Sequence, residues 1–123
     1  MIRAIWTEIP ARNIERALRF YTTLFELEPV EIVDDGPRRR ATLVNTSDGG
    51  GTGISLNQTD NFEPGNNGVL VYLHVGEDLT DNLNRVEAAG GKIFEAKTSM
   101  GQAGYYATIE DTEGNVLALY SEN

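Results

Sequence analysis

The stretch WTEIPARNIERALRFYTTLF, residues 6–25, decides the fold, because it predicts a strand followed closely by a helix. In a strand over residues 4–9, successive side chains point to opposite faces. Ile9 therefore lies on one face, while Trp6 and Glu8 share the other.

A helix is expected after Asn13, whose side chain is suited to cap the first turn. Apolar residues then recur at helical spacing up to about Leu27, namely Ile14, Ala17, Leu18, Tyr21, Leu24 and Phe25. Asp78 opens a second run of this kind, which Gly90-Gly91 ends. A shift of about 65 residues superposes the two runs, with Ile14, Leu18 and Tyr21 falling on Leu79, Leu83 and Val86.

Further strands follow each helix. They are predicted over residues 30–33, 40–44 and 54–56 in the first half, and over 69–75, 92–95, 105–110 and 116–121 in the second. Each half thus has the order strand, helix and three strands. We predict an α+β fold of two βαβββ modules with pseudo-twofold symmetry, spanning about residues 1–60 and 68–123 of a single domain, 1–123.

Composition removes several classes of function. The chain has 123 residues, and 10 Lys and Arg against 19 Asp and Glu give a formal net charge of −9. Such a surface repels phosphate backbones and anionic lipids, so we expect no nucleic-acid and no membrane partner. The absence of cysteine excludes thiolate zinc sites and cysteine nucleophiles. No apolar run approaches the ~18 residues of a membrane span, and no signal peptide is recognisable, so we expect a cytoplasmic protein.

Six different short motifs follow one another along the chain, at residues 6–10, 15–21, 71–75, 85–91, 104–107 and 111–115. In this order and spacing they resemble the vicinal oxygen chelate superfamily, which contains glyoxalase I, bleomycin-resistance proteins and extradiol dioxygenases. The resemblance covers nearly the whole chain. It implies that the curved sheets of the two modules form a cup, in which members bind small molecules, usually as homodimers.

The resemblance also implies where a metal would be held. Members that use a metal take four His, Gln or Glu ligands from the first and last strands of each module. The matching positions here are Trp6, Ser55, Leu70 and Ala118, and none of these is a usual ligand of a divalent ion. We therefore expect no cofactor and no metal. A divalent metal held by other donors, for example Glu8, Asn57 and the single histidine, His74, remains the alternative.

The predicted cup offers a set of ligand-binding candidates: Trp6, Glu8, Ser55, Asn57, Leu70, Tyr72, His74, Tyr105, Ala118 and Tyr120. Glu8 beside Trp6 suits a cationic or polar aromatic ligand, or a general base. Equally, Glu8 could pair with an arginine while Trp6 fills an interface. His74 could transfer a proton near neutral pH, or be a hydrogen-bonded structural residue. The tyrosines could stack on a planar ligand, or be ordinary strand residues.

These features favour a protein that binds an aromatic or polar small molecule in the sheet cup without a metal. The alternative is an enzyme related to lactoylglutathione lyase or to the dioxygenases, with a lyase, isomerase or dioxygenase activity. Such an enzyme would use unconventional metal ligands, or Glu8 and His74 as acid–base catalysts. A third hypothesis is a structural protein whose own side chains fill the cup. Fold alone does not choose among them, because this superfamily performs many different chemistries.

Overall fold

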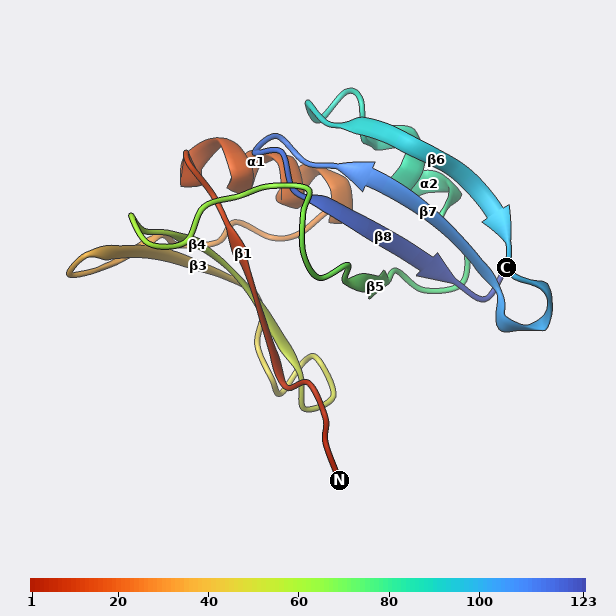
Figure 1. Cartoon of the computed structure of the whole chain (residues 1–123), viewed down its shortest axis with the longest axis horizontal. Coiled ribbons are helices and arrows are strands. Elements are labelled where there is room, and N and C mark those ends of the chain that lie inside the picture. The colour runs from red at the N-terminus through yellow and green to blue at the C-terminus, as the bar shows by residue number, and fades with distance from the viewer.

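The computed structural model describes all of residues 1–123 and contains two four-stranded sheets (Figure 1). The first has the strand order β1 (Trp6–Pro10), β4 (Gly53–Gln58), β3 (Arg38–Val44), β2 (Val33–Asp35) and carries helix α1 (Ile14–Phe25). The second has the order β5 (Tyr72–His74), β8 (Val116–Ser121), β7 (Tyr105–Glu110), β6 (Lys92–Ser99) and carries α2 (Thr80–Arg85). A short 3-10 helix, Gly101–Ala103, joins β6 to β7.

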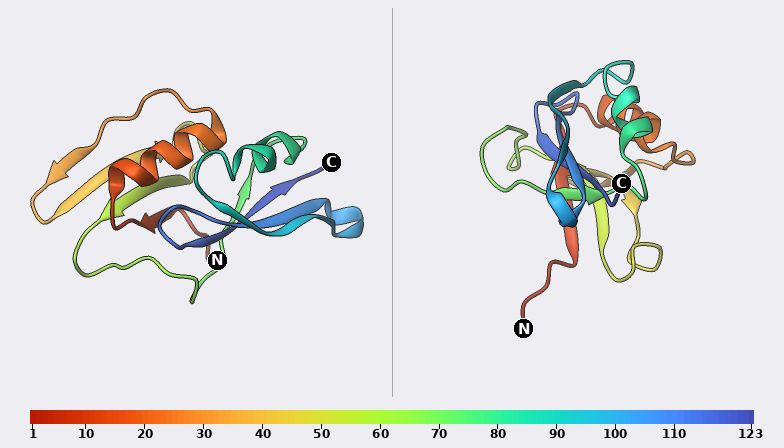
Figure 2. Two further views of the ribbon diagram at one scale, coloured as in Figure 1. Left: turned by 90° about the horizontal axis from the view of Figure 1, so that it is seen from above. Right: turned by 90° about the vertical axis from the view of Figure 1, so that its right-hand side faces the viewer.

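The two sheets repeat the same connections. β1 is parallel to β4, β5 is parallel to β8, and all other pairs are antiparallel. Seen from above, the helices lie together along one side of the molecule, and they are in contact with each other (Figure 2). The predicted α+β fold of two βαβββ modules is confirmed. No helix is long and apolar enough to cross a membrane.

Four elements are shorter or shifted relative to their predicted bounds. The strand predicted over residues 30–33 is wrong except at Val33, because the observed strand β2 covers Val33–Asp35, where it pairs with β3. The first helix ends at Phe25 because Glu26 adopts a left-handed conformation with φ of +52°. The second ends at Arg85 and continues only as turns, since the Gly90-Gly91 pair lets the chain leave the helix. The strand predicted over 69–75 is paired only at Tyr72–His74, where β8 lies beside it.

The core follows from the alternation of side chains along the strands. Ile9 and its cross-strand partner Leu56 are buried beneath α1, whose buried residues are Ile14, Ala17, Phe20, Tyr21 and Leu24. Leu73 and its partner Leu119 are buried in the same way below α2. Because neighbouring strand residues point to opposite faces, Trp6 and Glu8 must lie on the open face of the first sheet.

The two modules are tied together at the turn between β7 and β8. The carboxylate of Glu113 accepts hydrogen bonds from the backbone N–H groups of Arg12 and Asn13, each at 2.9 Å. It also accepts two from the Arg16 guanidinium, at 2.7 and 2.9 Å, and its side chain is fully buried. A carboxylate of the second module thus binds the backbone N–H groups of Arg12 and Asn13, which precede α1 of the first module. Its negative charge also lies near the positive end of the helix dipole.

Asp111 extends this contact into the core. Its carboxylate accepts a hydrogen bond from the Tyr21 hydroxyl at 2.6 Å and further bonds from the backbone N–H groups of Glu113 and Asn115. The side-chain amide of Asn115 donates to the Pro10 carbonyl at 2.8 Å, at the end of β1. We call residues Asp111–Asn115 with these partners the intermodule turn.

Replacing Glu113 with Gln should destabilise the protein by about 2 kcal/mol, because a buried acceptor of five hydrogen bonds loses its charge opposite Arg16. The matched control is Glu15→Gln, whose exposed pair with Arg39 should contribute little. Urea denaturation measures both variants. Equal losses of stability for the two would contradict a central role for the intermodule turn.

The same carboxylate predicts a pH dependence. Burial alone would raise the pKa of Glu113, but hydrogen bonds from Arg16, the Asn13 N–H and Thr112 outweigh it and lower the pKa below its ordinary 4.5. A lowered folded-state pKa stabilises the fold above the ordinary value and ceases to do so as the pH falls through the folded value. The stability difference between wild type and Glu113→Gln should therefore shrink between pH 7 and about pH 3. A constant difference across this range would refute the assignment.

Candidate functional site

Each sheet has two edge strands, and one edge of each sheet borders a cleft. These are β1 of the first sheet, whose other edge is β2, and β5 of the second, whose other edge is β6. The cleft between them has a volume of about 520 Å³. Three of the residues singled out from the sequence line it: Trp6 from β1, and Tyr72 and His74 from β5. The remaining wall comes largely from the loop between β3 and β4, including Asp48, Gly49 and Thr52.

On the first sheet, Trp6 is held in place by its neighbours on β4. Its indole N–H donates to the Ser55 hydroxyl at 3.1 Å. Directly across the strands lies Gly53, and a Cβ there would come within 2.3 Å of the indole ring, so only glycine leaves room for it. The ring remains 42% exposed, and it therefore presents a fixed aromatic surface to the cleft.

Glu8 lies two residues along β1 on the same open face. The Asn57 side-chain amide donates to both of its carboxylate oxygens at 3.1 Å. Glu8 makes no ion pair, so the hypothesis that it pairs with an arginine is wrong in this structure. Asn57 is buried, and its Oδ1 has no hydrogen-bond partner. Ser55, Asn57 and Glu8 do not line the cleft, and of the three only Ser55 forms a hydrogen bond with Trp6.

On the second sheet, His74 is fixed by two contacts. Its Nε2 lies 2.6 Å from the Glu122 carboxylate, and its ring meets Tyr120 edge to face at 5.2 Å. Tyr72 and Ala118 share this open face and pair directly with each other. Leu70 precedes β5, is exposed, and does not line the cleft. Glu122 was not among the predicted site residues. The side-chain alternation that places Ala118 and Tyr120 on one face, continued by two residues, would have indicated it.

Tyr105 does not lie on the open face, which corrects the sequence analysis. It pairs with Ser121, packs against the core, and has the Lys97 ammonium 4.7 Å from its ring centroid. Tyr106 takes the open face instead, with its ring 6.4 Å from that of Tyr72. Its hydroxyl donates to Glu95 at 2.9 Å, which raises the pKa of Tyr106. A shift of one residue along a strand moves a side chain to the other face.

The residues at the family's metal positions do not fit a metal. The Trp6 N–H is a donor and is bonded to Ser55, whereas the side chains of Leu70 and Ala118 carry no donor atoms for a metal. Ser55 alone offers an oxygen, and that hydroxyl is fully buried beneath the indole. Nowhere in the chain do three His, Asp or Glu side chains come together as ligands for a metal ion. We derive no chemical step through a metal at this site.

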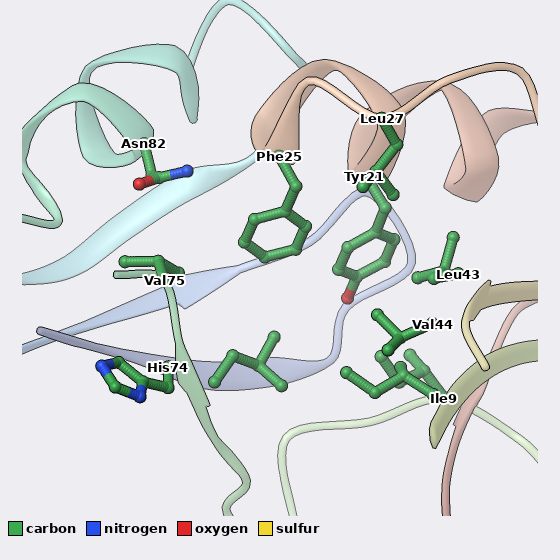
Figure 3. A pocket seen from close by; sticks show the side chains of 11 residues that line it. Ile9, Tyr21, Phe25, Leu27, Leu43, Val44, His74, Val75 and Asn82 are labelled. Atoms are coloured by element: carbon green, nitrogen blue, oxygen red, sulfur yellow. The ribbon is translucent and has the colours of Figure 1, made fainter. Parts of the chain in front are cut away.

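A second, smaller cavity of about 250 Å³ lies between the modules on the helix side of the sheets (Figure 3). Val44, Ile54, Leu73 and His74 form a wall that it shares with the cleft. Its own lining consists of Ile9, Tyr21, Phe25, Leu27, Leu43, Val75 and Asn82. No local sequence pattern predicts this cavity, because it forms where the faces of two separately predicted modules meet.

The comparisons with known proteins agree with this architecture. A hypothetical protein from S. aureus is 22% identical, with a TM-score of 0.64, and the match covers 98% of this chain and 94% of that one. A glyoxylase/bleomycin resistance protein/dioxygenase domain from Frankia sp. EAN1pec is 16% identical, with a TM-score of 0.76 and coverage of 100% and 93%. A glyoxalase-related enzyme from Fulvimarina pelagi is 16% identical, with a TM-score of 0.71 and coverage of 98% and 88%.

At these identities the solved structures show a shared fold only. No curated protein matches the sequence. The sequence model of one family, however, matches residues 3–119, which is nearly the whole chain. The chain therefore belongs to the Glyoxalase/Bleomycin resistance protein/Dioxygenase superfamily.

Proposed function

We propose that this chain is a cytoplasmic homodimer that binds an aromatic or polar small molecule in the cleft between β1 and β5, without a metal. The observation that carries the proposal is the cleft itself, which has about 520 Å³ of space and is lined by Trp6, Tyr72 and His74 from two different modules. Concave sites with aromatic walls and a few fixed polar groups are typical of small-molecule binding.

The charges around the cleft favour a neutral or cationic ligand over an anionic one. Glu8 has no cationic partner and lies on the same face as Trp6, and Asp48 contributes another carboxylate to the lining. A planar cation over the exposed indole face would gain both a cation–π contact and the attraction of these carboxylates. The formal net charge of −9 acts in the same direction.

The absence of usual metal ligands supports metal-free binding. Trp6, Ser55, Leu70 and Ala118 stand at the positions where the superfamily's metal-dependent members place His, Gln or Glu. A divalent ion needs several oxygen or nitrogen donors in fixed geometry, and these four side chains supply one buried hydroxyl.

An enzyme remains the second candidate, and the contact between His74 and Glu122 favours it. At 2.6 Å the carboxylate can orient the imidazole, whose other nitrogen could then exchange a proton with a ligand in the cleft. Glu8 is less well placed as a base, since both of its oxygens accept from Asn57 and it does not line the cleft. Loss of turnover in His74→Ala with ligand affinity retained would select this candidate.

The unpaired strand edges support the homodimer. β1 and β5 end their sheets with free backbone groups, and exposed apolar residues that do not line the cleft lie just before them: Ile2, Ile5, Val69 and Leu70. Exposed edges of this kind are usually covered in native proteins. A second copy along these edges would cover them, and sedimentation equilibrium of the purified chain tests this directly.

Because Trp6 is the only tryptophan, its fluorescence reports on the cleft alone. We expect planar heteroaromatic cations or neutral heteroaromatics to change its emission, and carboxylate analogues of equal size to bind at least about tenfold more weakly. Tyr72→Ala should weaken binding by about three- to tenfold, through the loss of one aromatic contact.

Phe62→Ala is the matched control, because Phe62 is an exposed aromatic residue that does not line the cleft. It should leave both affinity and emission unchanged. A panel of such compounds that leaves Trp6 emission unaltered would argue against the proposed site, as would an equal loss of affinity in the two variants.

A further inference from the structure

The smaller cavity between the modules has an almost entirely apolar wall. Nine of its 11 lining residues are hydrophobic. The rings of Tyr21 and Phe25, both from α1, are nearly parallel at 20°, with centroids 6.1 Å apart. Figure 3 shows both rings directed into the space between α1, β5 and the first sheet, with Asn82 and His74 at one side. Aromatic and aliphatic side chains from both modules thus surround one space.

The polar side chains of this wall have partners elsewhere. The Asn82 amide donates to the Leu24 carbonyl at 3.1 Å, and the Tyr21 hydroxyl donates to Asp111 at 2.6 Å. His74 Nε2 lies 2.6 Å from Glu122. A buried water needs two to four polar partners. Only the remaining polar atoms of Asn82 and His74 are left for a water molecule, so the cavity offers water few partners. It also has no lysine or arginine to balance an anion.

The cavity is open to solvent on one side, and its size also distinguishes it from an ordinary packing defect. Protein interiors are close-packed, and voids larger than a water molecule are few. An apolar cavity of roughly 150 Å³ already suffices to stay dry and bind benzene. At about 250 Å³, this one has room for one or two fused rings.

We propose that this cavity is a second binding site, separate from the cleft, for a neutral aromatic molecule of one or two rings. The ligand packs against Tyr21 and Phe25 and places its one polar group beside Asn82 or His74. A charged molecule of the same size is excluded, since it would lose its hydration without gaining a partner. The site does not depend on the function proposed for the cleft, because Leu43 and Val75 line only this cavity and Trp6 lines only the cleft.

The experiment is a titration of the full chain with indole, followed by NMR of methyl-labelled protein. The methyl groups of Leu43 and Val75 should shift in a saturable way, while the Trp6 indole N–H signal stays in place. At ten times Kd, indole should raise Tm by about 4 °C. Indole-3-acetate, which adds a carboxylate, should bind at least about tenfold more weakly.

Two cavity-filling variants sharpen the test. Val75→Phe and Leu43→Phe should each abolish the indole shifts at the remaining labelled methyl group, and Val33→Phe, at an exposed position on β2, should not. If either filling variant fails to fold, the other carries the comparison. Shifts centred on Trp6 and Tyr72, or no saturable shift at Leu43 and Val75 of the wild type, would overturn the proposal.

Discussion

The contact between the carboxylates of the intermodule turn and the start of α1 is the interaction on which the rest of the structure depends. Glu113 accepts hydrogen bonds from the backbone N–H groups of Arg12 and Asn13, just before α1, and from the Arg16 side chain. Asp111 accepts a hydrogen bond from Tyr21 in the core. Asn115 reaches the end of β1. These bonds hold the first sheet in place relative to the second. They therefore help to set the widths of the cleft and of the smaller cavity between the modules. The carboxylates of Glu113 and Asp111 can remain charged inside the protein because each of their oxygens accepts at least two hydrogen bonds.

The open faces of the sheets show how one fold can carry different chemistry. By the resemblance, Trp6, Ser55, Leu70 and Ala118 match the strand positions that hold metal ligands in some members of the superfamily. On the first sheet, the indole of Trp6 packs against Gly53 and donates a hydrogen bond to Ser55. The aromatic wall formed in this way supports the proposal that the cleft binds a planar molecule.

Much of the fold could be predicted from hydrophobic periodicity, because it reflects which face of each element is buried. The shared face of Trp6 and Glu8 followed from alternation around Ile9, and the two modules followed from the repeated helix pattern. Tyr105 and Tyr106 could not be told apart, since adjacent tyrosines fit either register and the pairing partner decides. The smaller cavity between the modules could not be predicted at all, because it depends on how the two modules pack rather than on any local sequence pattern.

The most direct test of the account is the metal content of the untagged, dialysed protein, measured by elemental mass spectrometry before and after incubation with nickel, zinc, manganese and iron. A binding protein with an aromatic wall at the family's metal positions should retain less than about a tenth of an equivalent of any of them. Retention of nearly one equivalent would contradict the claim of metal-free binding, because it would require ligands other than the four side chains at those positions. Metal-dependent catalysis would then become the first hypothesis.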